Sequence, residues 1–159
     1  TTMRRVIFLL ASCLVASHAP AADPVPYPNG YRHWHHVKTM VIRPGHPLHE
    51  AFGGIHHLYA NDKARQGYER GRFPDGSVIV FDLLDARDAD AALTEGPRKV
   101  LGVMMKDAKR YASTGGWGFE GFKGDSSSER VVGDNAAGAC FQCHTSRADH
   151  DFVFSALRR

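Results

Sequence analysis

The sequence has few cysteines, a small net charge and no long hydrophobic run. Three cysteines among 159 residues exclude a small domain that is held together by several disulfides. The 20 lysines and arginines are nearly balanced by 17 acidic residues, so the chain lacks the basic surface with which nucleic-acid-binding domains bind phosphate. The length also excludes a doubly wound enzyme with a second lobe. A hydrophobic content of 43% instead predicts one globular domain.

The amino-terminal segment has the pattern of a secretory signal peptide. Two arginines precede the apolar residues 6–15, and small residues follow up to Ala22. The apolar run is too short to span a bilayer as a helix. We therefore expect residues 1–22 to be removed on export to the periplasm, which would leave a mature domain of residues 23–159. The alternative is a lipoprotein signal with the lipid on Cys13, although the apolar run before it is short.

The two cysteines outside this segment lie in Cys140-Phe141-Gln142-Cys143-His144, which is the C-x-x-C-H signature of c-type haem attachment. Two thiols at this spacing add to the two vinyl groups of haem, and the adjacent histidine reaches the iron. A redox dithiol or half of a zinc site would use similar spacing. However, a redox motif normally follows a strand near the start of a βαβ unit, whereas this one comes late in the chain after the Gly/Ala-rich residues 133–139, and the sequence has no second cysteine pair. We predict one covalent haem c, held by Cys140 and Cys143, with His144 as an axial ligand.

The sixth position of the iron is open in this prediction. Residues 145–159 contain no methionine, so a protein ligand would have to come from upstream. Met104 is the best candidate, with a core methionine as the alternative. The pair His56-His57 and the segment 46–50, which contains two histidines and a glutamate, could bind metal, but core or exposed histidines are the simpler interpretation.

Hydrophobic patterning predicts an α+β fold that is mainly β. Antiparallel strands are expected at residues 34–42, 53–60, 77–84, 98–105 and 117–123. The central strand is apolar on both faces up to Asp82, so both faces should be covered.

The connecting segments are predicted as follows. A short helix should begin at Asn61 or Asp62. The polar residues 86–97 predict an irregular excursion or a short helix, and residues 124–139 a loop. After the haem motif, Ala148, Phe152 and Ala156 recur at i, i+4 spacing, which predicts a terminal helix with Asp149 and Asp151 as charges near its start. Arg147 and Lys123 could pair with haem propionates, but the sequence does not place either.

Taken in order, the motifs of the chain resemble those of the cytochrome P460 family, which includes the cytochromes c′-beta. The resemblance covers nearly all of the mature chain. It is carried by Tyr31-Arg32-x-Trp34, Gly71-x-Phe73-x-Asp75-Gly76-Ser77-Val78, Lys106-Asp107, Trp117, the C-x-x-C-H motif and Asp151-Phe152-Val153-Phe154. It implies a curved antiparallel sheet over the haem, a homodimer, His144 as proximal ligand and a distal pocket for small ligands.

Two positions distinguish the chemistries within this family. The resemblance implies that hydroxylamine-oxidising members carry a haem-linked lysine on the central strand and a carboxylate on the neighbouring strand. Phe81 and Gly102 occupy these positions here. The chain is therefore similar to the cytochromes c′-beta, whose distal haem face is capped by phenylalanines. Phe81 and Phe52 are the candidates for this cap, although a strand phenylalanine is by default a core residue.

A phenylalanine cap offers no hydrogen bond to a bound ligand. Iron-bound O2 depends on such a bond more than NO or CO do, so the pocket should favour NO and CO. The predicted distal pocket consists of Phe52, Phe81, Gly102 and Met104, and no residue is predicted to be catalytic. We expect a cytochrome that captures NO or takes part in nitrogen-oxide metabolism, with a redox partner protein but no nucleic acid. The alternatives are an enzyme that oxidises hydroxylamine or NO, and a six-coordinate electron carrier.

Overall fold

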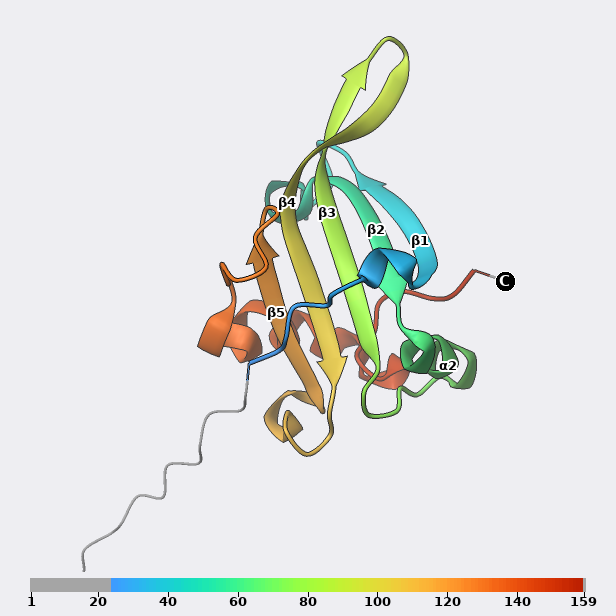
Figure 1. Cartoon of the computed structure of the whole chain (residues 1–159), viewed down its shortest axis with the longest axis vertical. Helices are drawn as coiled ribbons and strands as arrows, with labels where there is room; N and C mark the ends of the chain where they lie inside the picture. The colour runs from blue at the N-terminus through green and yellow to red at the C-terminus, as the bar shows by residue number, and fades with distance from the viewer. Residues whose placement is uncertain (1–23, 159) are drawn as a thin grey trace, which may run out of the picture.

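The computed structural model describes residues 24–158, which form a five-stranded antiparallel sheet (Figure 1). The strands lie in sequence order: β1 (His35–Ile42), β2 (Gly54–Ala60), β3 (Val78–Ala89), β4 (Ala92–Lys106) and β5 (Trp117–Lys123). The mainly β fold and all five expected strands are therefore confirmed. The predicted signal peptide and Cys13 lie outside the described residues. Between residues 24 and 158, no helix is long and apolar enough to cross a membrane.

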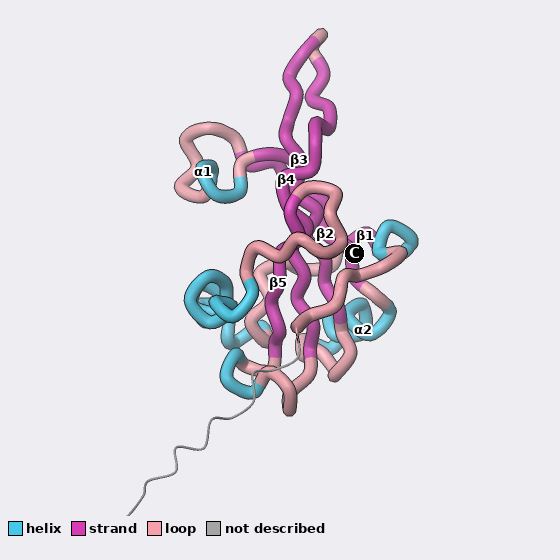
Figure 2. Tube along the Cα trace, turned by 60° about the vertical axis from the view of Figure 1, so that its left-hand side comes forward, coloured by secondary structure: helices cyan, strands magenta, loops and turns pink. Residues whose placement is uncertain are grey.

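Short helices connect and cover the strands (Figure 2). The longest is α2 (Asp62–Arg70), which begins as predicted: the Asn61 side chain accepts a hydrogen bond from the Ala64 N–H at 2.9 Å. The others are η1 (Tyr31–His33), α1 (His49–Phe52), η2 (Ala112–Thr114), η3 (Gly133–Asn135), the π-helical turn η4 (Ala137–Phe141), α3 (Gln142–His144) and η5 (Thr145–His150). Part of the expected loop at 124–139 is thus helical.

Both faces of the sheet are covered, as the apolar β3 predicted. In Figure 1 the N-terminal segment crosses in front of the sheet and the C-terminal segment, in red, runs behind it. Val80 belongs to the core cluster on the first face, and Ile79 to the cluster on the second face. Side chains of a strand alternate between faces, so Phe81 shares the second face with Ile79. The C-terminal segment with the haem motif packs on this second face, because Cys140 and Phe141 contact the same cluster.

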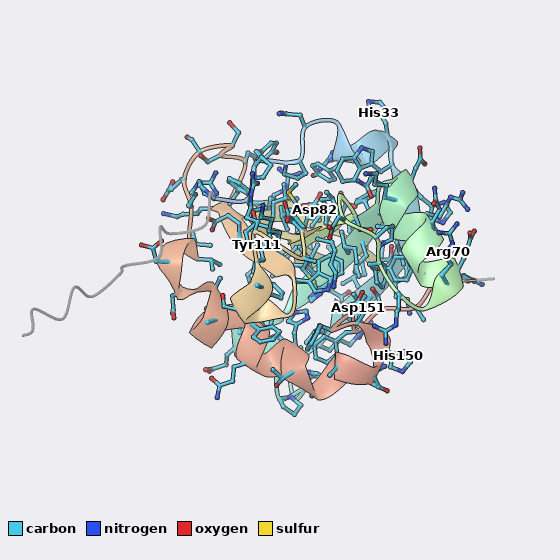
Figure 3. All side chains as sticks on the ribbon, turned by 90° about the horizontal axis from the view of Figure 1, so that it is seen from below. His33, Arg70, Asp82, Tyr111, His150 and Asp151 are labelled. Atoms are coloured by element: carbon cyan, nitrogen blue, oxygen red, sulfur yellow. The ribbon has the colours of Figure 1, made fainter. Side chains whose placement is uncertain are left out.

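Asp82 is a buried carboxylate in the middle of β3 (Figure 3). It accepts hydrogen bonds from the Tyr31 hydroxyl at 2.6 Å and from Arg98 Nε at 2.6 Å, which compensate for its loss of water. Burial, followed by the hydrogen bond to Asp82, raises the pKa of Tyr31 to about 12. These contacts attach the N-terminal segment to the first face of the sheet.

Beyond the sheet, β3 and β4 continue as an exposed two-stranded ribbon, seen at the top of Figure 1. The irregular excursion or helix predicted for residues 86–97 is therefore wrong, since strand pairing continues from Ala86 opposite Glu95 to the tip of the ribbon. Asp90 and Ala91 form the turn, with φ of 52° and 57°. Residues 85–95 are exposed on both faces, so no hydrophobic alternation marks them as strands.

The terminal helix predicted from Ala148, Phe152 and Ala156 is also wrong. The helical segment ends at His150, Asp151 and Phe152 adopt left-handed conformations, and residues 153–158 are not helical. Asp151 is consequently not a charge at a helix N-terminus. Its carboxylate instead binds Lys106 and the Phe73 N–H, and these tertiary contacts override the local pattern.

Candidate haem site

The haem motif lies on a short, irregular helical segment formed by η4, α3 and η5. Cys140 and Cys143 are three positions apart on it, so their side chains lie on neighbouring turns of one face. Both are free thiols; Cys140 is half-buried and Cys143 is exposed. Burial, and to a lesser extent the charge of Glu120, raises the pKa of the Cys140 thiol. Both sulfurs are thus available for thioether bonds.

His144 is oriented by a hydrogen bond to the backbone. Its Nδ1 lies 2.7 Å from the carbonyl oxygen of Phe152. A carbonyl oxygen only accepts, so the proton is on Nδ1 and the lone pair of Nε2 is free to bind a metal. Burial lowers the pKa of His144, although the bond to Phe152 acts in the opposite direction, and the neutral ring is the form that binds iron. This is the arrangement of a metal-binding histidine with its outer partner in place.

Aromatic rings surround His144. The ring of Phe119 on β5 lies 4.9 Å from the His144 ring, and the ring of Phe154 lies 5.0 Å from it on the tail. Phe141 contacts both Phe119 and Phe152, at 6.3 and 5.2 Å between ring centroids. Flat apolar rings of this kind suit the surface of a porphyrin.

The predicted distal residues share the second face of the sheet with Phe119. Phe81 on β3 is opposite Gly102 on β4, and one step along the sheet Met104 is opposite both Ile79 and Phe119. Met104 packs against the same core cluster as Cys140. The structure thus places Phe81, Gly102 and Met104 on the face that the haem motif covers.

The two candidate cap residues are in contact with one another. Phe52 ends α1 and Phe81 lies on β3, and their rings meet edge to face with centroids 5.9 Å apart. A Cβ at position 102 would lie 3.0 Å from Cδ1 of Phe81, which is closer than an ordinary van der Waals contact. A side chain at position 102 would therefore require the Phe81 ring to shift.

His56, which the sequence analysis considered only as a possible metal ligand or a core histidine, lies in this region. It is 1% exposed, and its ring meets that of Phe81 edge to face at 4.6 Å. Its Nε2–H donates to the Phe52 carbonyl, while its Nδ1 is buried without a hydrogen-bond partner. Burial lowers its pKa, so the ring is neutral at pH 7. The available signal was strand alternation, which puts His56 and Leu58 on one face and His57 on the other.

The other described histidines are not grouped with further potential metal ligands. His57 faces away from His56 and contacts Glu95 at 2.5 Å and Thr39 at 2.9 Å. His46 accepts a hydrogen bond from the Leu48 N–H. Over the described part of the chain, no three histidine, cysteine or acidic residues come close enough to hold a metal ion.

The two basic residues considered as partners for the haem propionates, Lys123 and Arg147, differ in their exposure and in their hydrogen bonding. Lys123 is exposed and pairs with Glu129 at 2.9 Å. Arg147, one turn after His144, has a buried Nε without a hydrogen-bond partner. A buried donor of this kind calls for an acceptor, and a propionate could supply it. Free thiols, an oriented neutral histidine, aromatic rings and this unpaired donor together fit a haem.

The sequence was compared with models of known families. The model of the family described as Cytochrome P460 matches residues 28–155. The chain belongs to the cytochrome P460 family. A search of curated proteins finds no match. Membership supports a haem-binding cytochrome and confirms the resemblance seen in the sequence motifs.

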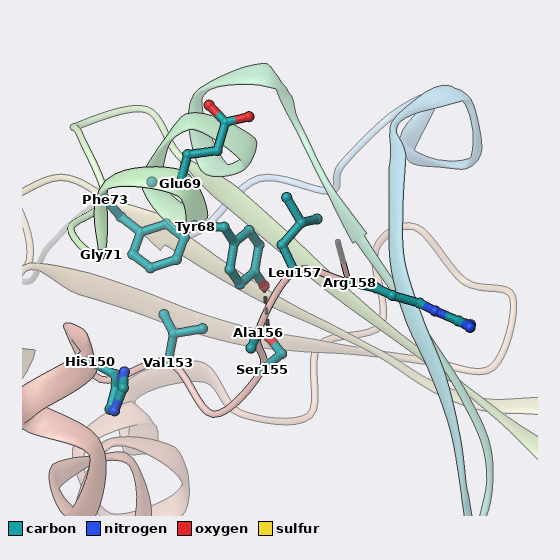
Figure 4. Close-up of a pocket in the computed structure, with 11 residues that line it drawn as sticks. Tyr68, Glu69, Gly71, Phe73, His150, Val153, Ser155, Ala156, Leu157 and Arg158 are labelled. Carbon is teal, nitrogen blue, oxygen red and sulfur yellow. Dashed lines mark hydrogen bonds between the residues drawn. The ribbon is translucent and has the colours of Figure 1, made fainter.

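In this cytochrome P460 family protein, a pocket of about 440 Å³ lies between α2 and the C-terminal tail, away from the haem motif (Figure 4). The hydroxyl groups of Tyr68 and Ser155 are 2.7 Å apart across it, and burial raises the pKa of Tyr68 to about 12. None of the cysteines, His144 or the distal residues line this pocket. Its polar contact attaches the tail to the body of the protein.

Proposed function

We propose that this protein is a periplasmic monohaem c-type cytochrome that binds NO and CO at a phenylalanine-capped distal face. The observation that carries the proposal is the bond from His144 Nδ1 to Phe152, which leaves Nε2 free within the C-x-x-C-H motif. The motif packs on the sheet face that bears Phe81 and Gly102. The positions that the resemblance assigns to the lysine and the carboxylate of hydroxylamine-oxidising members are occupied by Phe81 and Gly102.

The residues on the motif side would hold the haem. Cys140 and Cys143 would form the two thioethers, and His144 Nε2 would bind the iron, which supplies the site for a diatomic ligand when bound. The Phe152 carbonyl fixes the tautomer of His144 and increases the basicity of Nε2. Phe119 and Phe154 pack on the imidazole and restrict its rotation.

The residues on the sheet would select the ligand. Phe81 and Phe52 are apolar and would offer no hydrogen bond to a bound ligand, which favours NO and CO over O2. Gly102 leaves room for the Phe81 ring. Met104 packs in the core cluster beside Ile79 and Phe119, which favours a structural role for its thioether and leaves the sixth position to an external ligand.

Hydroxylamine oxidation is a second candidate because of one observation. His56 has a basic nitrogen, Nδ1, buried without a partner beside Phe81. Such a nitrogen could accept a proton from a protic substrate, which Gly102 cannot do. Its ring is covered by Phe81, so this activity would require Phe81 to move.

The haem can be tested directly with the purified protein. Acid–acetone treatment should leave the haem on the wild-type chain and remove it from a Cys140→Ala/Cys143→Ala variant, as intact mass would show. The ferrous protein should be high-spin and should respond to NO and CO. A red-shifted, broadened chromophore with turnover of hydroxylamine would favour the enzyme instead, and sharp low-spin bands without NO would favour an electron carrier. An unmodified polypeptide mass in a matured sample would refute the proposal.

Export is the separate part of the proposal. It rests on the basic and apolar residues of the leader at 1–22. The protein from a periplasmic fraction should begin near Asp23 by mass spectrometry. A lipid-modified chain that begins at Cys13 would contradict this cleavage and support the lipoprotein alternative.

A further inference from the structure

Two successive residues after the haem motif have backbone conformations that side chains disfavour. Asp151 has φ of 51° and Phe152 has φ of 65°. The left-handed region is unfavourable for residues with a Cβ, and two in succession are rare. Local preference therefore does not explain this turn, and contacts with the rest of the protein must hold it.

Asp151 makes these contacts. Its carboxylate binds Lys106 Nζ at 2.6 Å and accepts the Phe73 N–H at 2.9 Å. Its carbonyl oxygen accepts the indole N–H of Trp117 at 2.8 Å. The side chains of Lys106 and Asp151 are only 11% and 10% exposed, so water screens this ion pair weakly. Figure 3 shows Asp151 between the sheet and the C-terminal helical segment.

The turn determines where one particular carbonyl group points. Phe152 follows Asp151, and its N–H donates to the Arg147 carbonyl at 2.8 Å. Its own carbonyl oxygen accepts the His144 Nδ1–H at 2.7 Å. The sheet residues Lys106 and Trp117 are thus connected to His144 through Asp151 and the Phe152 carbonyl.

We propose that Asp151 is a positioning residue. Held by Lys106 and Trp117, it fixes the Phe152 carbonyl as the hydrogen-bond partner of His144. In this way it tunes the bond from His144 to the haem iron. The inference rests on the proposed haem attachment through Cys140, Cys143 and His144. A well-aligned acceptor at Nδ1–H makes Nε2 more basic, which strengthens the iron–histidine bond and favours the ferric state. A displaced acceptor makes Nε2 less basic, which weakens the iron–histidine bond and favours the ferrous state.

The test uses the haem-loaded protein and an Asp151→Asn variant. The iron–histidine stretching frequency of the ferrous protein, measured by resonance Raman spectroscopy, should fall. The reduction potential should rise; a tenfold change in the ferric-to-ferrous ratio equals about 59 mV for one electron. Asp149→Asn is the matched control, because Asp149 is exposed, pairs with its neighbour His150 and would lose the same charge. It should leave the stretching frequency unchanged.

A second variant removes a contact without changing charge. Trp117→Phe keeps a ring but loses the N–H that binds the Asp151 carbonyl, and it should shift both readouts in the same direction by less. If Asp151→Asn fails to fold, Trp117→Phe still tests the positioning role of Asp151. Unchanged frequency and potential in folded, haem-loaded variants would overturn the positioning role and leave the proposed function intact. Absence of covalent haem from the wild type would instead refute the proposed function.

Discussion

Phe81 is the side chain on which the proposed ligand selectivity depends. It contacts Phe52 and His56, and its ring occupies the space above Gly102. It is half-buried, as expected of a ring at the boundary between the sheet core and a binding face. A ligand that reaches the distal side would have to displace this ring.

Replacing Phe81 with alanine should accelerate CO and NO binding. Removal of the ring removes the displacement step, and a tenfold faster association would correspond to about 1.4 kcal/mol of barrier. Flash photolysis and stopped-flow absorbance would measure the rates. Val80→Ala is the control, since Val80 is the adjacent residue on the opposite face and should lower stability without changing the rates. Equal rates in wild type and Phe81→Ala would make Phe81 a core residue and remove the basis for the selectivity argument.

His56 should make stability depend on pH. Burial lowers its pKa below the ordinary value of 6.5, so the unfolded chain binds its proton more readily than the folded protein. The associated stability is complete above about pH 6.5 and is lost as the pH falls through the folded pKa. Thermal unfolding between pH 7.5 and pH 5 should show a smaller decrease for His56→Gln than for the wild type. His57→Gln serves as the control on the opposite face of β2, and an identical decrease in wild type and His56→Gln would contradict the assignment.

At the scale of elements, the molecule combines a well-packed sheet with two irregular segments. The helical segment of the haem motif is short and mixes π, α and 3-10 turns, so contacts with Phe119 and the tail, rather than helix propensity, hold it in place. The ribbon of β3 and β4 has the opposite character, because its exposed residues are ordered mainly by strand pairing, with one side-chain contact from Glu95 to His57 on β2.

The tip of the ribbon provides a prediction about local stability. Asp90 and Ala91 both have positive φ, as a type I′ turn requires, and Asp-Gly is the preferred sequence for it. Ala91→Gly should relieve about 1 kcal/mol of strain and increase the hydrogen-exchange protection of the ribbon amides. Ala89→Gly should decrease it, since Ala89 lies within a strand, where glycine is unfavourable. Lower protection in Ala91→Gly would show that the turn does not have the type I′ geometry.

At the scale of the whole molecule, the surface carries exposed apolar side chains at opposite edges of the sheet. Val41 on β1 and Leu93 on the ribbon are 37% and 36% exposed and line the same surface pocket. Val131 is 54% exposed and packs near β5, the other edge strand. Exposed apolar side chains that lie together are candidates for an interface.

We expect the protein to be a homodimer, as its family resemblance implies. Sedimentation equilibrium at micromolar concentration should give twice the monomer mass. Val41→Lys/Leu93→Lys should shift the equilibrium toward monomer, because burying two charges at an interface is unfavourable. Val131→Lys should leave the dimer intact. A monomeric wild type would refute the dimer without affecting the haem proposal.

The sequence by itself determined the sheet and the motif for haem attachment. Strand alternation is a local property, and it located all five strands because each has at least one buried face. It failed for residues 86–97, where neither face is buried. The spacing of Cys140, Cys143 and His144 is also local, so the chemistry of the motif could be predicted without a structure.

Only the tertiary structure decided how the site is arranged. The contact of Phe52 with Phe81, the burial of His56 beside them and the link from Lys106 through Asp151 to His144 join residues far apart in the chain. The i, i+4 spacing in the tail predicted a helix. The prediction failed because the spacing carries no information about contacts with Lys106 or Trp117. Those partners stabilise a left-handed turn at Asp151 and Phe152 that local preference disfavours, and this turn orients the carbonyl that His144 needs.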